Sequence, residues 1–258
     1  MLGAIAGDII GSAWEAKGEK RLDFPLFDKF SRFTDDTVMT VAIAHALLDD
    51  RDYAEAMREY GMRYPFAGYG LQFSRWLCDV NMGPYGSYGN GGAMRVSPVA
   101  WAMHSIDAVL EEAARSAAPT HNHPEGTKGA QAIALAVFLA RTAAEKEEIR
   151  REIASRFHYD LSRSVDDIRL RYLPDVTAAG SVPESIISFL DADSFEAAVR
   201  NAVSLGGDTD TMACMAGAIA EAYFGGVPAP IVREVENRLP AEFQRVIDRF
   251  AERYGINS

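Results

Sequence analysis

The chain has 258 residues, of which 48% are hydrophobic and 24% are charged, a composition typical of a globular protein with one substantial core. Its net charge of −11 disfavours a surface that coats nucleic acid, so we expect no stable nucleic-acid complex. The only cysteines, Cys78 and Cys214, lie far apart, which argues against a disulfide scaffold and a cysteine-based zinc site.

The sequence also lacks the features of an exported or membrane-bound protein. Residues 1–7 have no basic segment before the apolar run, and Asp8 interrupts that run, unlike a signal peptide. The longest apolar segment, residues 130–140, is far shorter than the ~20 residues that a membrane helix needs. We therefore expect a cytoplasmic protein that does not bind membranes.

Residues 2–14 carry apolar side chains on one helical stripe, with Gly3, Gly7 and Gly11 at every fourth position. Such a row of glycines favours close packing against a second helix in the core. The run that begins at Gly3 recurs at residues 217–220, which indicates that these two helices pack together. We expect Asp8, on the first helix, to be a buried carboxylate satisfied by its neighbours rather than a ligand.

Residues 17–32 are charged and aromatic, and we expect a loop that covers part of a site. A helix is predicted from Asp35 to residues 49–50, with Thr34 as its N-cap and Asp35 and Asp36 in its first turn. Capping and the helix dipole would explain these acidic residues without any ligand, so the motif alone leaves both interpretations open. His45 lies on the apolar face and is expected to be a core histidine.

Residues 81–95 are rich in glycine and lead into a helix predicted over residues 93–103. Glycines let the backbone approach a ligand closely, and N–H groups at a helix start bind anions. The segment matches neither a Walker loop nor a Rossmann fingerprint. The alternative to a ligand-binding loop is a tight connection between two elements. Further along, either His121 or His123 is expected to contact substrate or its own neighbours, with a two-histidine metal site as the alternative.

The remaining periodic segments predict helices over residues 53–64, 71–79, 107–117, 129–144, 147–157 and 208–224, and two that begin near residues 228 and 240. Capping-box spacings predict two more helix starts, one at Ser181 and one at Asp193. Residues 158–179 are expected to be a loop with short helical pieces. Since no stretch alternates with period two and no composition shift marks a boundary, we predict one compact all-α domain over residues 1–258.

Two segments, residues 33–37 and 204–211, place hydroxyls and carboxylates at helix starts, and Asp36-Thr37 aligns with Asp210-Thr211. Helix capping does not require so many side-chain oxygens at both helix starts. Carboxylates brought together would repel each other unless cations neutralise them. Oxygen ligands favour Mg²⁺, Mn²⁺ or Ca²⁺ over zinc or copper. The pairing predicts a metal-dependent hydrolase whose ions are held between the two segments.

Five motifs, in order along nearly the whole chain, resemble the ADP-ribosylglycohydrolase family, which includes dinitrogenase-reductase-activating glycohydrolases and the ADP-ribosyl-hydrolases of animals. They are Gly3–Glu15, Phe33–Thr37, Gly86–Arg95, Thr120-His121 and Gly206–Thr211. The resemblance implies an all-α fold with a central dimetal site that holds two Mg²⁺ or Mn²⁺ ions and binds ADP-ribose with its distal ribose at the metals.

By motif position, the resemblance also implies the roles of individual residues. The implied metal ligands are Thr34, Asp35, Asp36, Asp208, Asp210 and Thr211. The implied substrate-binding residues are Gly86, Ser87, Tyr88, Gly89, Asn90, Gly91, Gly92, Met94 and His121. The glycine-rich loop, residues 86–92, would cradle the diphosphate through its backbone N–H groups, and His121 would lie near the ribose. Glu15 matches a glutamate placed by the metals and joins Asp35 and Asp36 as a catalytic candidate.

The expected activity is cleavage of the N- or O-glycosidic bond between ADP-ribose and an acceptor. We hypothesise that a water at the metals, assisted by Asp35 or Asp36, attacks the anomeric carbon, whose oxocarbenium character the carboxylates stabilise. The expected partners are an ADP-ribosylated protein or other ADP-ribose conjugate and free ADP-ribose, and arginine is the first-ranked acceptor. The alternatives are serine or a nucleobase as acceptor, a non-catalytic crystallin-like relative, a nucleotide phosphohydrolase, and a module that only binds ADP-ribose.

Overall fold

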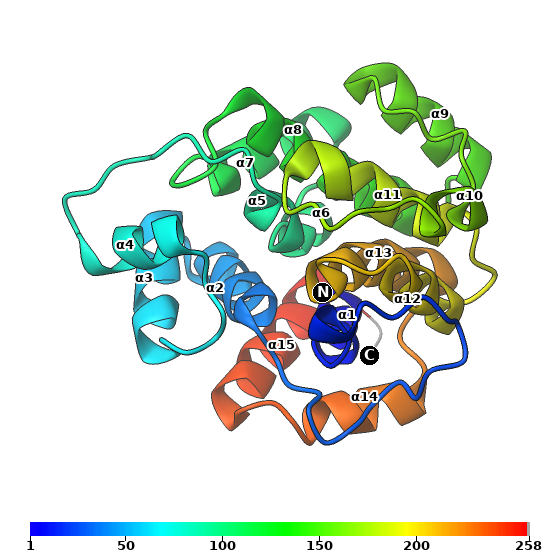
Figure 1. The fold of residues 1–258 in the computed structure, drawn as a ribbon. Helices are drawn as coiled ribbons and strands as arrows, with labels where there is room; N and C mark the ends of the chain where they lie inside the picture. The colour runs from blue at the N-terminus through cyan, green and yellow to red at the C-terminus, as the bar shows by residue number, and fades with distance from the viewer. Residues whose placement is uncertain (257–258) are drawn as a thin grey trace.

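The computed structural model describes residues 1–256, which form helices joined by loops, with no β-strand in that range. The prediction of an all-α fold is confirmed. The helices, labelled as in Figure 1, are α1 (Leu2–Gly11), α2 (Asp35–Asp49), α3 (Tyr53–Arg63), α4 (Leu71–Cys78), α5 (Gly91–Met94), α6 (Ser97–Ala102), α7 (Ile106–Ala117), α8 (Pro124–Arg141), α9 (Lys146–Phe157), α10 (Val165–Arg169), α11 (Ala178–Leu190), α12 (Phe195–Ser204), α13 (Thr209–Phe224), α14 (Ala229–Glu236) and α15 (Ala241–Tyr254).

Helices α1 and α13 form the centre of the core and are buried along most of their length. They pack against each other more extensively than any other pair of helices. The approach is close because glycines face the partner's backbone. A Cβ at Gly3 would overlap the carbonyl of Gly217, and a Cβ at Gly7 would overlap the carbonyl of Ala213. The pairing predicted from the repeated sequence run is therefore confirmed.

The other helices surround this central pair (Figure 1). Helices α8, α11 and α12 pack against α13, and α5, α6 and α7 pack on α8. Helix α2 contacts α1 and carries α3 and α15, while α4 packs on α3. As a result, the starts of α2 and α13 and the loop that precedes α5 come together, although they lie far apart in the sequence.

The helix predicted over residues 93–103 is wrong: the structure has two short helices, α5 and α6, separated at Arg95 and Val96. Pro98 lies in the first turn of α6 and has no N–H with which to extend α5. The carbonyl of Met94, four residues earlier, instead accepts a hydrogen bond from the thiol of Cys214 (3.3 Å).

The helix start predicted at Ser181 is also wrong, because α11 begins at Ala178 and has Thr177 as its N-cap. The hydroxyl of Thr177 accepts a hydrogen bond from the N–H of Gly180 (3.1 Å). Pro183 therefore lies inside the helix rather than at its start. At the next helix, the N-cap is Ser194 and not Asp193.

Two further boundaries differ from the prediction. Helix α1 stops at Gly11, and a turn and a 3₁₀ helix, η1 (Glu15–Lys17), follow instead of a helix to residue 14. Helix α8 starts at Pro124, earlier than predicted, and the ring of His123 caps it. Across residues 1–256, none of the helices combines the length and the apolar character needed to cross a lipid bilayer.

We predict that Gly7→Ala destabilises the protein, although alanine has the higher helix propensity, because its Cβ would overlap the backbone of Ala213. Overpacking of this kind typically costs about 1–3 kcal/mol. The measurement is urea unfolding. The matched control is Gly83→Ala, since a Cβ at Gly83 would meet no heavy atom within 4 Å. Equal stability of Gly7→Ala and the control would contradict the close packing of α1 on α13.

Candidate active site

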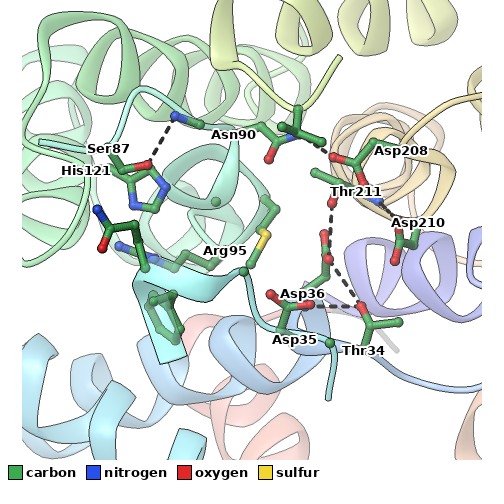
Figure 2. A pocket seen from close by; sticks show the side chains of 18 of the residues that line it. Thr34, Asp35, Asp36, Ser87, Asn90, Arg95, His121, Asp208, Asp210 and Thr211 are labelled. Atoms are coloured by element: carbon green, nitrogen blue, oxygen red, sulfur yellow. Dashed lines mark hydrogen bonds between the residues drawn. The ribbon is translucent and has the colours of Figure 1, made fainter. Parts of the chain in front are cut away.

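A cavity of about 680 Å³ opens where the starts of α2 and α13 meet the loop before α5 (Figure 2). Every residue that the sequence analysis assigned to the site lines this cavity, except Gly92. Gly92 lies behind the wall, where a Cβ would be 3.3 Å from the Cβ of His121. The structure therefore brings together segments 34–36, 86–94 and 208–211 with Glu15 and His121.

The start of α2 is held in place by Asp8 of α1. Thr34 caps the helix, since its hydroxyl accepts a hydrogen bond from the N–H of Asp36 (3.3 Å). The carboxylate of Asp8 accepts hydrogen bonds from the N–H groups of Thr34 (2.9 Å) and Thr37 (3.1 Å), and from the hydroxyls of both threonines (2.7 and 2.5 Å). The expectation of a buried, satisfied carboxylate at Asp8 is confirmed.

The start of α13 is set by a Gly206-Gly207 turn. Both glycines have positive φ angles (+73° and +81°), a conformation that other residues rarely adopt. The hydroxyl of Thr209 donates a hydrogen bond to the carbonyl of Gly11 (2.8 Å), which fastens the start of α13 to the end of α1. This attachment places Asp208 and Asp210 on the cavity side.

Loop 17–32 supports the same turn. The Nζ of Lys20 donates hydrogen bonds to the carbonyl of Leu205, just before the two glycines, and to the carbonyl of Arg169 (3.1 Å). Arg32 at the end of this loop lines the cavity, and so does Glu15, two residues before the loop begins. The loop therefore borders the site, as the sequence predicts.

Carboxylates from α1, η1, α2 and the start of α13 converge at one end of the cavity. They form two groups whose oxygens lie within 4.8 Å of one another: Asp8, Asp36 and Asp210 in one, and Glu15, Asp208 and Asp210 in the other. The hydroxyl of Thr211 donates to Asp36 Oδ2 (3.2 Å), which links the start of α13 to the start of α2 (Figure 2).

This convergence disfavours the charged form of each carboxyl group. Burial, and then the negative charge of Asp210, raises the pKa of Asp36 well above its usual value. Burial, and then Asp208, does the same to the pKa of Asp210. Burial and the charge of Asp8 raise the pKa of Asp35 to about 7. Positive charge at this end of the cavity would relieve the repulsion.

The donor set fits divalent cations that prefer oxygen ligands. It consists of carboxylates and threonine hydroxyls, which suit Mg²⁺, Mn²⁺ or Ca²⁺. Asp36 Oδ1 is buried and has no hydrogen-bond partner within the described chain, so a ligand-binding atom is available there. Asp8 was not predicted as a ligand, yet its carboxylate belongs to one of the two groups. Neither group includes a histidine.

The glycine-rich loop forms the opposite end of the cavity, but fewer of its N–H groups are free than the sequence suggests. Those of Gly86, Ser87, Gly89 and Asn90 already donate to other groups of the protein. Those of Tyr88 and Gly91 donate to no other group within residues 1–256, and both residues line the cavity.

Asn90 connects this loop to the carboxylates. Its side-chain N–H₂ donates to Asp208 Oδ2 (2.6 Å) and to the hydroxyl of Ser181 (3.2 Å). Its backbone N–H donates to the carbonyl of Val176 (3.0 Å), so the segment around Val176 supports the loop. Figure 2 shows Asn90 between the two ends of the cavity.

His121 and His123 differ in position and partners. His121 is buried against the glycine-rich loop, and burial followed by the positive charge of Arg95 lowers its pKa well below the usual value. His123 is exposed, and its ring accepts a hydrogen bond from the N–H of Glu125 (3.1 Å) at the start of α8. His45 is less buried than predicted and bonds to Tyr60 and Asp49 (both 2.9 Å).

The side wall of the cavity was not predicted from the sequence. It consists of the connection between α3 and α4, together with Tyr85, Arg95 and Val176. The position of Tyr85 next to the glycine-rich loop is the one signal that would have identified a wall residue. Nothing in the sequence of residues 67–73 distinguishes them from an ordinary turn and helix start.

Comparison with known proteins gives a consistent result. The sequence profile of the ADP-ribosylglycohydrolase family matches residues 1–257. The chain is 28% identical to the ADP-ribosylhydrolase ARH3 of Danio rerio, covering 91% of this chain and 84% of that protein. It is 25% identical to the ADP-ribosylarginine hydrolase Tri1 of Pseudomonas putida, covering 91% of this chain and 72% of that protein. A solved structure of an "ADP-ribosylglycohydrolase-related protein complex" shares the fold, with a TM-score of 0.73, 24% identity and coverage of 97% and 95%.

We predict that a divalent cation raises the melting temperature more at pH 8 than at pH 5. The folded-state pKa values of Asp8 (about 6), Asp35 (about 7), Asp36 and Asp210 exceed the unfolded value near 3.9. At pH values between the unfolded and the folded pKa values, the folded state therefore binds more protons than the unfolded state. Without cations, the stability that these groups provide is lost as pH rises through their folded pKa values. Cations compensate most where the carboxylates are ionised.

The measurement is thermal unfolding at both pH values, in EDTA and in Mn²⁺ or Mg²⁺. Each kcal/mol corresponds to about 2–4 °C for a chain of this size. The pKa of His121 is lowered, so its contribution to stability changes with pH in the opposite direction below pH 6.5. At a given pH this contribution is the same with and without cation, so it cancels when the two melting temperatures are subtracted. A cation effect of equal size at pH 5 and pH 8 would contradict the prediction.

Proposed function

The chain belongs to the ADP-ribosylglycohydrolase family and is a glycosidic-bond hydrolase, and from this premise we propose that it cleaves the bond between ADP-ribose and an acceptor at a pair of divalent cations. One observation carries the proposal: carboxylates from both ends of the chain converge in a cavity that a glycine-rich loop closes on the far side. The proposed cations are Mg²⁺ or Mn²⁺.

The two ends of the cavity suit the two ends of ADP-ribose. The N–H groups of Tyr88 and Gly91 would donate to the oxygens of the diphosphate. The terminal ribose would then lie toward the carboxylates, with His121 along the wall between them. Ser87, Gly89 and Asn90 would shape the loop through bonds that they make within the protein.

The chemistry at the ribose needs negative charge, an attacking water and a route for a proton. As the bond to the acceptor breaks, the anomeric carbon gains oxocarbenium character, which the neighbouring carboxylates stabilise. Divalent cations held there would orient the ribose hydroxyls and favour ionisation of the attacking water. Asp35 or Asp36 would accept the proton of that water, and the released acceptor would take up a proton. The products are ADP-ribose and the free acceptor.

Glu15 would act at the entrance rather than in the buried centre. Its side chain is exposed and lies within the group that contains Asp208 and Asp210. Burial of part of the carboxyl group, and then the charge of Asp208, raises its pKa. We propose that Glu15 approaches the cation site together with the start of loop 17–32.

Arginine is the acceptor that we place first. The name of one relative, the ADP-ribosylarginine hydrolase of Pseudomonas putida, supports it, and an acidic cavity end favours a guanidinium leaving group. The relative named ARH3 is more similar in sequence, and that name specifies no acceptor. Serine-linked and nucleobase-linked ADP-ribose therefore belong in the same test.

We predict release of free ADP-ribose from at least one conjugate in a panel of arginine-, serine- and nucleobase-linked ADP-ribose, and loss of that release in EDTA. The measurement is chromatography of the products at matched substrate concentrations. Cleavage of the diphosphate of ADP-ribose would point to a phosphohydrolase instead. Binding of ADP-ribose without turnover of any conjugate would indicate a binding module.

We further predict that Asp36→Asn and Asp210→Asn each lower kcat by about 10²–10³-fold, the usual size for loss of a group that stabilises charge in the transition state. Titration with Mn²⁺ should show weaker binding in both variants. The control is Asp248→Asn, an exposed aspartate on α15 outside the cavity. Turnover and Mn²⁺ binding equal to those of the control would remove the proposed mechanism.

A further inference from the structure

Behind the glycine-rich loop, a buried arginine, a threonine and a histidine form a chain of hydrogen bonds that the proposed mechanism does not use. The side chain of Arg95 is fully buried, and Thr120 and His121 are buried beside it. Arg95 Nη2 donates to Thr120 Oγ1 (2.9 Å), and Thr120 Oγ1 lies 2.8 Å from His121 Nδ1. Arg95 and His121 both line the cavity, and Thr120 lies between them.

The direction of this chain follows from the chemistry of its members. A guanidinium has only donors, so the oxygen of Thr120 must accept from Arg95. The hydroxyl of Thr120 has one hydrogen left, and its one partner other than Arg95 in the described chain is His121 Nδ1. If Thr120 instead accepted from both Arg95 and His121, its own buried hydrogen would have no acceptor. We therefore assign Thr120 as the donor to Nδ1, which places the hydrogen of the neutral imidazole on Nε2.

The surroundings keep His121 neutral and direct its Nε2 toward the loop. Burial and the positive charge of Arg95 disfavour the imidazolium form. Burial lowers the pKa of Arg95 only to about 10, so its guanidinium stays charged at neutral pH. A Cβ at Gly91 would lie 2.9 Å from His121 Nε2, and one at Gly89 would lie 3.7 Å from it. These glycines leave the space that the Nε2–H faces.

We propose that Arg95 and Thr120 are positioning residues that fix His121 as the Nε2–H tautomer and thereby supply the cavity with one more uncharged donor beside the N–H of Gly91. The donor would bind an oxygen of a phosphate or sugar ligand. The identity of that ligand as ADP-ribose depends on the function proposed above, whereas the tautomer does not.

The tautomer is tested by long-range ¹H–¹⁵N correlation on the uniformly labelled protein, which separates protonated from unprotonated ring nitrogens. The spectrum of His121→Gln assigns His121 among the five histidines. In the unaltered protein and in Thr120→Ser, we expect a proton on Nε2 and none on Nδ1. In Thr120→Val, we expect the two tautomers to mix, while the signals of the other four histidines report that the fold is intact.

A proton on Nδ1 in the unaltered protein, or an unchanged tautomer in Thr120→Val, would overturn the proposal. If Thr120→Val does not fold, Arg95→Met offers a second test. Without the guanidinium, the oxygen of Thr120 has no donor unless His121 supplies one, so the Nδ1–H form should gain population. An unchanged His121 spectrum in Arg95→Met would likewise overturn it.

The role of the donor is tested by calorimetry with ADP-ribose. Thr120→Ser should bind like the unaltered protein, and Thr120→Val should bind about twofold more weakly, because evenly mixed tautomers leave the Nε2–H donor on only about half of the molecules. His121→Gln, whose amide N–H₂ can reach the position of Nε2, should bind more tightly than His121→Asn, whose amide reaches only that of Nδ1.

The outcomes separate this inference from the proposed function. A mixed tautomer in Thr120→Val with unchanged ADP-ribose affinity would overturn the positioning role and leave the hydrolase proposal intact. Failure of the unaltered protein to bind ADP-ribose would overturn both the proposed function and the assigned ligand, while the nitrogen spectrum would still decide the tautomer.

Discussion

The close packing of α1 on α13 is the constraint on which the site depends. Glycines on α1 let its backbone touch that of α13, so Asp8 reaches the starts of two helices that are distant in sequence. Its carboxylate holds the N–H groups and hydroxyls of Thr34 and Thr37, which fixes the first turn of α2. With a larger residue at Gly7, the helices would separate, and the groups that contain Asp36 and Asp210 would separate with them.

The same packing creates an electrostatic cost that the protein alone does not offset. Asp8 receives four hydrogen bonds, which partly counter the effect of burial on its pKa. Asp36 receives fewer, and one of its oxygens is buried without a partner in the described part of the chain. Buried carboxylates without compensating charge are strongly unfavourable. The fold therefore holds carboxylates together at one end of the cavity, where divalent cations would neutralise their charge. Cations bound there would stabilise the folded state, so cation affinity and conformational stability would be linked.

Local sequence patterns were sufficient for the architecture and for the acidic residues at the two helix starts. Glu15, the glycine-rich loop and His121 were assigned to the site through the resemblance to the family. Helical periodicity gave the elements, and oxygen-bearing residues at two helix starts gave the acidic cluster. Three features were not predictable in this way. The break at Arg95 depends on where Pro98 falls relative to Met94 and on a thiol from another helix. The bond between Asn90 and Asp208 joins segments 118 residues apart. The position of Asp8 beside the proposed metal ligands depends on the interhelical distance, which the glycine pattern indicates only qualitatively.

Asn90 gives the two ends of the cavity a common support. Its amide bonds to Asp208 on the acidic side, while its backbone belongs to the loop in which the N–H groups of Tyr88 and Gly91 donate to no other group of the described chain. An amide suits this position because it donates to a carboxylate without adding charge; an aspartate there would add a further negative charge, and a lysine would compete with a cation. Neutral N–H donors, with the buried guanidinium of Arg95 beside them, therefore lie at one end of the cavity, and the acidic side chains lie at the other. A ligand that is anionic in its middle and polyhydroxylated at its end would suit both ends of the cavity. Its phosphates would lie against the N–H groups of the loop, and its hydroxyls would lie toward the carboxylates, which would hold the cations.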